Sequence, residues 1–325
     1  MMMLGKVHAL ALLCLASVMY QTTMATVTPM PGNIKTELTK RGGFTQFLGL
    51  LKDAGLLDTL ITADNITVFA PTDAALARVP ADQLAAITGN HTELQRIMGY
   101  HAVLEDVRSL NNDNGRVRLL MFKVINSSND LPIMINPYKK IHTLAAEGVN
   151  ITERAIRVSN GYFHVLGGIM IPPQGDVMEI VAANGGLTSF TTLLKSTGLV
   201  DVIDSHDYNT VFAPRDAAFA RLNSEVSKFL LSDLDAQIDV LSFHFSLRTI
   251  EYSVGMFHGE ILHPYRINAT LMMFTDFVTG DITVNTANIV QKDISATNGV
   301  IHIIDEVLIP PGVLLKMQDN GITTG

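Results

Sequence analysis

The sequence has 325 residues, of which 47% are hydrophobic and 17% charged, and its formal net charge is −8. This length accommodates about two domains of ordinary size, each able to bury its own core. Acidic residues outnumber basic ones, 31 to 23, and no basic run occurs, which argues against nucleic-acid binding and against electrostatic docking on a membrane. A single cysteine excludes a disulfide-rich scaffold and zinc sites built on thiolates.

The N-terminus predicts a secretory signal peptide over residues 1–25. Lys6 supplies the positive start, a mostly apolar run follows, and Thr23-Met24-Ala25 offers a small-residue cleavage site. A transmembrane anchor is the alternative, but the apolar run is shorter than the ~20 residues that span a bilayer. The cysteine, Cys14, lies inside this segment. We therefore expect a secreted chain without a membrane anchor, held together by burial alone.

Five Asn-x-Ser/Thr sequons agree with a secretory route, because such tripeptides accept glycans in that compartment. One sequon is weak support, since the tripeptide arises often by chance. The five glycan-acceptor candidates are Asn65, Asn90, Asn126, Asn150 and Asn268.

A long internal repeat organises the rest of the chain. Residues 67–77 read Thr-Val-Phe-Ala-Pro-Thr-Asp-Ala-Ala-Leu-Ala, and residues 210–220 repeat nine of these eleven positions. A second segment, residues 160–173, recurs as residues 298–311 with its Asn-Gly start and Pro-Pro end. A period this long indicates tandem globular domains. We expect a first domain over 35–173, a second over 176–312 and a short polar tail over 313–325.

Each repeat opens with helix signals. In the first copy, apolar residues at i, i+3, i+4 and i+7 from Phe44 to Leu51 predict an amphipathic helix that Gly55 closes. Residues 66–70 then form a β-rich run halted by a proline. Asp73 is expected to cap a short helix that follows, its carboxylate accepting amides of the first turn.

Later in the copy the signals turn from helix to strand. A longer helix is predicted around Leu94 to Val103. Asn114-Gly115 is a hairpin candidate, and apolar alternation on both sides of Asn160-Gly161 predicts two strands joined by a turn. Helices first and strands later, twice over, predict an α+β fold.

The repeated segments resemble the two signature segments of fasciclin domains, in the right order and in both copies. The resemblance covers about residues 35–312. It implies two tandem domains, each a β-sandwich-like wedge flanked by helices. It also implies a secreted or surface protein of cell–matrix adhesion, whose partners would be an integrin-type receptor or matrix components such as collagen and glycans.

The resemblance also points to adhesion residues. An Asp-Ile pair of animal members falls on Asp293 and Ile294, and a carboxylate suits the metal ion through which integrins commonly take their ligands. Ala155 stands at the matching position of copy one. The structural alternative is that Asp293 begins a turn and that Ile294 packs in the core.

A second proposed adhesion element of the family is an aromatic-His pair, which falls on Tyr100-His101 and Phe243-His244. Here the structural interpretation is the stronger one, because an aromatic ring and an imidazole among aliphatic residues of a helix usually pack in the core. His164 and His302 lie in apolar alternation and are expected to be structural.

The sequence gives little support for catalysis. It contains none of the serine-nucleophile, zinc-helix or phosphate-loop motifs, so we expect no enzyme activity, no cofactor and no metal site. The densest acidic cluster, residues 201–207, has the composition of a solvated turn, and calcium binding there is the minor alternative. His258 and His263 have no third zinc ligand nearby.

Taken together, these residues predict a secreted extracellular-matrix or adhesion protein without enzymatic activity. The alternative is a structural protein of an acidic matrix, mineralised or not, that binds glycan, collagen or calcium without a cell receptor. The net charge permits this alternative, but the long acidic runs that would favour it are absent.

Overall fold

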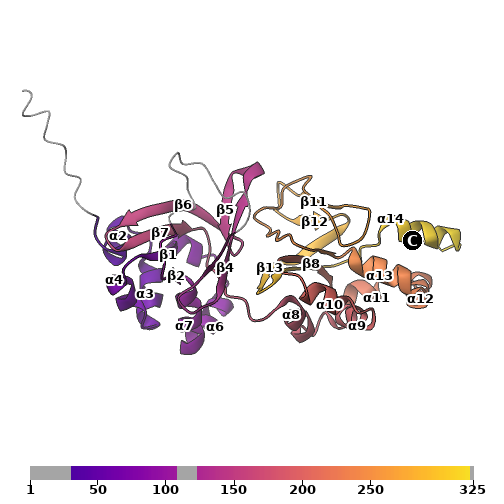
Figure 1. Ribbon diagram of the computed structural model, residues 1–325, viewed down its shortest axis with the longest axis horizontal. Coiled ribbons are helices and arrows are strands. Elements are labelled where there is room, and N and C mark those ends of the chain that lie inside the picture. The colour runs from indigo at the N-terminus through magenta and orange to yellow at the C-terminus, as the bar shows by residue number, and fades with distance from the viewer. Residues whose placement is uncertain (1–30, 108–122, 323–325) are drawn as a thin grey trace, which may run out of the picture.

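The computed structural model describes residues 31–107 and 123–322, which form two domains that follow one another along the long axis of the molecule (Figure 1). Each domain has helices first and strands later, so the predicted α+β class is confirmed. The expected signal peptide and the Asn114-Gly115 hairpin lie outside the described residues.

Domain 1 begins with helices and closes with strands. Its helices are α2 (Ile34–Arg41), α3 (Thr45–Asp53), α4 (Leu57–Thr62), α5 (Asp73–Leu76), α6 (Ala81–Gly89) and α7 (His91–Tyr100), with a short 3-10 turn η2 (Lys139–Ile141). Its strands are β1 (Ile66–Pro71), β2 (Ala102–Val103), β3 (Lys123–Asn126), β4 (Pro132–Tyr138), β5 (Thr143–Ala146), β6 (Val149–Val158) and β7 (Gly161–Leu166).

Domain 2 repeats this order and adds a C-terminal helix. Its helices are α8 (Val177–Ala183), α9 (Thr188–Ser196), α10 (Leu199–Asp204), α11 (Asp216–Ala220), α12 (Ser224–Ser232), α13 (Leu234–Ser242) and α14 (Pro311–Asp319). Its strands are β8 (Asn209–Pro214), β9 (Phe245–Ser246), β10 (Ile261–Leu262), β11 (Leu271–Thr275), β12 (Ile282–Val284), β13 (Ala287–Ala296) and β14 (Gly299–Ile304).

Each domain has one seven-stranded mixed sheet, ordered β2-β1-β7-β6-β5-β4-β3 in domain 1 and β9-β8-β14-β13-β12-β11-β10 in domain 2. The repeated Thr-Val-Phe-Ala-Pro box is β1 and β8, and each pairs in parallel with the strand after the Asn-Gly turn. All other pairs are antiparallel. The two halves of the sequence therefore build the same topology.

Two apolar cores recur in both domains, and domain 2 has a further cluster between its last helices. In domain 1, one core packs the helices on β1, β6 and β7. The other brings side chains of β3, β4 and β5 against those of β1, β6 and β7, so the sheet folds over on itself. This second core gives each domain the β-sandwich-like form that was expected, with helices covering the outer face.

The Asn160-Gly161 turn is fixed by a close backbone approach. A Cβ at Gly161 would lie 1.8 Å from the carbonyl oxygen of Ile66, so no larger residue fits there. The Asn160 side chain accepts from the amide of Ile34 and donates to the carbonyl of Leu60. The turn between β6 and β7 thus also holds the first helices of the domain.

The expected cap of the short helix after the repeated box needs correction. The cap of α5 is Thr72, whose hydroxyl accepts from the amide of Ala75, and not Asp73. The Asp73 carboxylate instead accepts from the amides of Thr45 and Gln46, at the start of α3. It therefore caps a helix that begins 28 residues earlier in the chain, a long-range contact that local spacing does not reveal.

The helix expected to run from Leu94 to Val103 ends earlier, at Tyr100. Residues 102–103 leave the helix because they pair with β1 as strand β2. The tail also differs from expectation, because residues 311–319 form α14. Its Val313 and Met317 are buried against apolar side chains of α12 and α13, so much of this segment belongs to domain 2.

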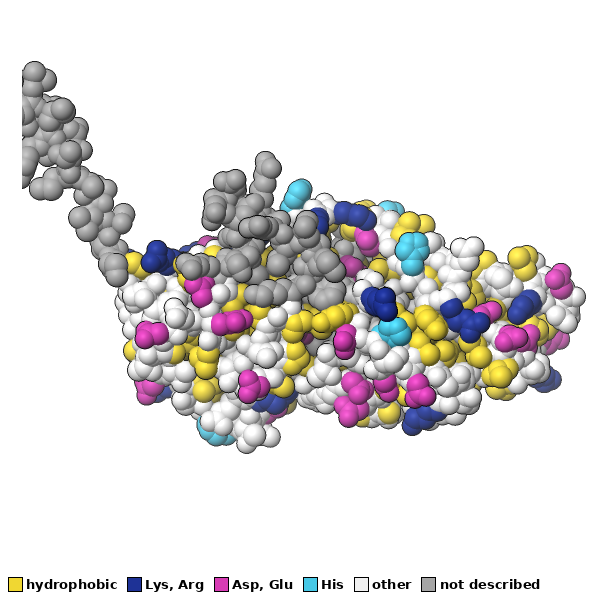
Figure 2. Space-filling view, viewed as in Figure 1, with side chains coloured by type: hydrophobic (Ala, Val, Ile, Leu, Met, Phe, Trp, Pro, Cys, Tyr) yellow, Lys and Arg dark blue, Asp and Glu magenta, His cyan; other side chains and the backbone are white. Residues whose placement is uncertain are grey.

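No helix in the described part of the chain has both the length and the apolar character needed to cross a membrane. Figure 2 shows acidic and basic side chains scattered over one face of the molecule, with no large area of a single sign. This distribution agrees with the argument from composition against nucleic-acid binding.

Candidate adhesion elements and the seam between the domains

Both aromatic-His pairs lie in the interior. The side chains of Tyr100, His101 and His244 have no exposed area, and that of Phe243 is almost fully covered. The Tyr100 hydroxyl donates to the carbonyl of Pro132. These four residues therefore cannot touch a receptor while the domains are folded, which favours the structural interpretation of the pairs.

His101 joins the end of α7 to the segment that follows β7. Its Nδ1–H donates to the carbonyl of Ile97 at 2.8 Å, and its Nε2 accepts from the amide of Met170 at 3.1 Å. Both ring nitrogens are thus used in the neutral imidazole. Burial lowers the pKa of His101 to about 4, so the ring stays neutral at physiological pH.

His244 repeats this arrangement in domain 2. Its Nδ1–H donates to the carbonyl of Val240 at 2.7 Å, and its Nε2 accepts from the amide of Leu308 at 3.0 Å. Burial lowers the pKa of His244 to about 4 as well. The repeated histidine is therefore a fixed part of each domain, bridging a helix end and the closing segment.

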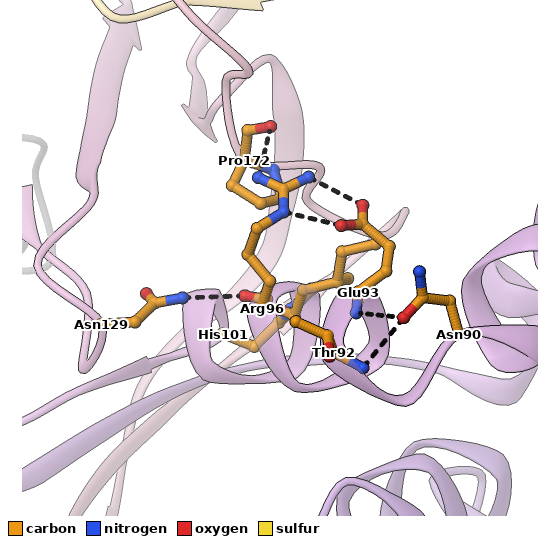
Figure 3. A network of polar contacts seen from close by, with 8 residues as sticks. Asn90, Thr92, Glu93, Arg96, His101, Asn129 and Pro172 are labelled. Carbon is orange, nitrogen blue, oxygen red and sulfur yellow. Dashed lines mark hydrogen bonds and ion pairs between the residues drawn. The ribbon is translucent and has the colours of Figure 1, made fainter.

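The outer side of α7 carries a polar network (Figure 3). The Asn90 side chain accepts from the amides of Thr92 and Glu93 at the start of the helix. The Arg96 guanidinium pairs with the Glu93 carboxylate and donates to the carbonyl of Pro172. This network ties the helix to the end of domain 1. Within this network Asn90 uses only its Oδ1. A glycan would attach to its other side-chain atom, Nδ2.

Asp293 lies in a bulge of β13, where the pairing with β14 shifts register. Its backbone is left-handed, with φ of 61°, and its amide donates to Nδ1 of His302. Both carboxylate oxygens are occupied: one accepts from the amide of Ser253 at 2.6 Å and the other from the Ser253 hydroxyl. The carboxylate thus holds the loop that carries Ser253.

The bulge itself belongs to the fold, because domain 1 has it too. Ala155 has φ of 49°, and its amide donates to Nδ1 of His164. The Asp293 carboxylate is therefore an addition of domain 2 to a shared backbone feature. The Ile294 side chain is half-buried and packs on the helix-covered core of domain 2, as the structural alternative predicted. The expected turn at Asp293 is instead this bulge.

The loop held by Asp293 forms the seam between the domains. The hydroxyl of Tyr252 donates to the Glu147 carboxylate of domain 1 at 3.0 Å, and the Tyr252 amide donates to the hydroxyl of Tyr138 at 3.1 Å. Met134 of β4 packs with Ile250 and Tyr252 in one buried cluster. Apolar packing and hydrogen bonds thus fix the two domains to each other.

Burial raises the pKa of the Glu147 carboxyl, which is 6% exposed at the turn between β5 and β6. A Cβ at Gly148 would lie 2.4 Å from the Tyr252 ring, so the glycine lets the ring approach the backbone. At the seam edge, Lys140 forms an ion pair with Glu260 at 3.1 Å.

Glu251 is a second buried seam carboxyl, 9% exposed. Burial and the charge of Glu260 raise its pKa to about 8. The amide of Glu251 donates to the Thr210 hydroxyl, just as the amide of Val107 donates to the Thr67 hydroxyl in domain 1. The two positions are therefore equivalent, and domain 2 carries an acid where domain 1 has buried valine.

The sequence alone did not identify these seam residues. Their partners are far apart in the chain, as Tyr252 and Glu147 are separated by 105 residues. The 143-residue repeat shift sets Ile250 against Val107, so only the matching hydrogen bonds to Thr67 and Thr210 reveal the equivalence of Glu251 and Val107. All five sequon asparagines are exposed in the structure: Asn65, Asn90, Asn126, Asn150 and Asn268.

The acidic cluster at residues 201–207 lies on α10 and the turn after it. Partial burial and the neighbouring carboxylates raise the pKa of Asp204. Among residues 31–107 and 123–322, no group of three or more His, Cys, Asp or Glu side chains is placed to hold a metal ion. The ring of His258 contacts Phe274 and Phe277 instead.

Comparison with known proteins gives matches along both domains. The family profile described as fasciclin domain matches residues 42–172 and 185–310. Human periostin is 26% identical over 249 residues, 76% of this chain and 28% of periostin. Transforming growth factor-beta-induced protein ig-h3 of Sus scrofa is also 26% identical over 249 residues, 76% of this chain and 35% of that protein.

This chain thus spans about a third of the length of these two relatives. A solved FAS1 domain pair from the insect cell adhesion molecule Fasciclin I aligns with 84% of this chain and 99% of that chain, at 17% identity and a TM-score of 0.41.

Proposed function

Because the chain belongs to the fasciclin family, we propose that it is a secreted, non-enzymatic protein of cell adhesion or of the extracellular matrix. The observation that carries the proposal is the match of both halves to the fasciclin domain. The exposure of all five sequon asparagines supports a glycosylated, secreted chain. The seam supports a role in which the two domains act as one rigid unit, which limits the entropy lost on binding a partner.

At residue level, the proposed receptor contact is Asp293 with Ile294. These are the adhesion candidates whose side chains are partly exposed. A receptor metal that took the Asp293 carboxylate would replace its two hydrogen bonds to Ser253. The fixed bulge supports the proposal, because it holds the residue in one backbone conformation.

Cell attachment to the purified, immobilised chain tests the general proposal. We expect cells to spread on the protein and a chelator of divalent cations to prevent it, since integrin-type receptors use a metal ion. Collagen or glycan binding without any cell spreading would contradict receptor-mediated adhesion. It would favour the alternative of a structural matrix protein.

Two matched variants test the residue-level proposal. Asp293→Ala removes the carboxylate, whereas Ser253→Ala removes the hydroxyl that donates to one of its oxygens and keeps the amide that donates to the other. If the carboxylate binds a receptor metal, Asp293→Ala loses attachment and Ser253→Ala retains it. If the carboxylate serves only the seam loop, Asp293→Ala loses two hydrogen bonds and Ser253→Ala one, and attachment follows the melting temperature in both variants.

A further inference from the structure

The hairpin between β11 and β12 presents an apolar tip. Its turn exposes Phe277 by 84% and Val278 by 95%. The turn is well braced, because the Asp276 carboxylate accepts from the amides of Val278 and Thr279 at 2.7 and 3.1 Å. The ring of His258 packs against Phe277 from the side. Exposed apolar groups held this firmly are typical of an anchor that enters a partner's pocket.

The same domain also carries an apolar pocket, between α9, α11, α12 and α13. Its volume is about 190 Å³. A cavity of about 150 Å³ lined by aliphatic and aromatic residues holds benzene, so this pocket has room for one phenyl ring. It is lined chiefly by Leu193, Phe219, Leu222, Leu230, Val240 and Leu241.

Two residues that line the pocket differ in character from their counterparts in domain 1. Helices α12 and α13 match α6 and α7 residue by residue, 143 positions apart. Ser227 and Gln237 line the pocket, and the residues at their positions in domain 1 are Leu84 and Leu94. Leu94 is buried in the core of domain 1. Domain 2 thus has polar residues where domain 1 has the buried Leu94 and the half-buried Leu84.

The tip of the hairpin also differs between the two domains. In domain 1 the equivalent hairpin, between β4 and β5, ends in Lys139-Lys140-Ile141-His142. That tip is engaged with the following domain, since Lys140 pairs with Glu260 and lies over the Phe257 ring. A fasciclin domain is therefore already the partner of this hairpin in domain 1. In domain 2 the equivalent tip is apolar and free.

We propose that copies of this chain associate head to tail, with Phe277 of one copy inserted in the α9–α13 pocket of the next. Figure 1 shows β11 and β12 on the opposite side of domain 2 from α9 and α11–α13, so a braced hairpin does not reach its own pocket. Because tip and pocket are different surfaces, the contact is heterologous and does not close on itself. Its product is a chain of copies.

The surface area that Phe277 and Val278 can bury is far smaller than the ~1,200 Å² buried in a stable protein–protein interface. The association is therefore weak in dilute solution. It becomes effective where the protein is concentrated or held on a surface, since neighbouring contacts then reinforce each other.

Sedimentation velocity on the full secreted chain, over a rising concentration series, tests the proposal. The tip variant is Phe277→Ser with Val278→Ser, and the filled variant is Ser227→Leu with Gln237→Leu, the residues of domain 1. We expect the wild type to grow into larger species with concentration and each variant to remain monomeric. An equimolar mixture of the two variants should stop at a dimer, because it holds one intact tip and one intact pocket per pair.

The controls separate this contact from other association. Leu315→Ser removes an exposed apolar side chain of α14 and should leave association unchanged. The filled variant should melt no lower than the wild type, and Ser227→Leu alone serves if the double change disturbs folding. A wild type that stays monomeric throughout overturns the proposal. Association of the filled variant at the wild-type level also overturns it, because the tip would then bind another tip or another surface.

Discussion

The two domains share a backbone plan and differ in what they present on it. Both have the parallel pairing of the repeated box, the buried histidine at the helix end and the bulge before the closing strand. Domain 2 adds a carboxylate in the bulge, an acid at the position of the buried Val107, an apolar hairpin tip and an open apolar pocket. The shared features maintain the fold, so the differences are where binding is to be sought.

Loss of the repeated histidine should have the largest effect, and it should be equal in the two domains. His101→Ala and His244→Ala each leave a cavity and unpartnered backbone groups in the interior. We expect each to lower the free energy of unfolding by about 3 kcal/mol. Denaturant unfolding of the full chain measures this loss. A cell-attachment defect without any loss of stability would contradict the structural role.

The second prediction separates the domains by pH. The folded-state pKa of Glu251 is about 8, against an ordinary value of 4.5. Between these values the folded chain keeps a proton that the unfolded chain has lost. Glu251 therefore contributes a fall in the free energy of unfolding as pH rises from 4.5 to 8. His101 and His244, whose folded-state pKa is about 4 against an ordinary 6.5, contribute a rise between these two values, so the net fall is expected from pH 6.5 to 8.

Glu251→Gln should remove the contribution of this carboxyl and stabilise the chain at pH 9 by about 2 kcal/mol. Val107→Ala provides a contrast at the equivalent position of domain 1: it should destabilise by a cavity without altering the slope. An unchanged pH profile in Glu251→Gln would show that the seam carboxyl ionises normally.

The third prediction concerns the seam, which only the tandem arrangement creates. Tyr252→Phe keeps the ring but removes the hydroxyl that donates to Glu147. We expect a loss of about 1–2 kcal/mol, because a buried carboxyl loses a partner. Hydrogen exchange of the β5–β6 turn should rise in the variant. Faster exchange confined to domain 2 would contradict a seam role for this hydroxyl.

The smallest effect should come from the cap of the short helix after the repeated box. Thr72 caps α5 in domain 1, whereas Arg215 at the same position makes no side-chain cap bond to α11. Arg215→Thr should stabilise domain 2 by about 0.5–1 kcal/mol, and Thr72→Arg should destabilise domain 1 by about as much. Paired melting curves check both signs at once.

The sequence predicted the repeat, the fold class and the burial of the histidines, because these depend on local pattern and on the recurrence of a motif. It misassigned the Asp73 cap, which acts on a helix 28 residues earlier. It missed the seam because Tyr252 and Glu147 belong to different domains and are 105 residues apart in the chain. The sequence also did not predict that Phe277 is exposed, because an apolar residue near a strand end usually packs inward.

The domain boundary near residues 174–175 stays a prediction, and so does adhesion through domain 2. One measurement tests both: cell attachment to the separate halves 26–174 and 175–325, with a melting curve for each. The control is Asp293→Ala in the second half, because the second half exposes the same seam surface with and without this substitution. We predict that both halves melt cooperatively and that cells attach only to the second half with Asp293 intact. Equal attachment to both halves would contradict the assignment, since the first half has Ala155 at that position.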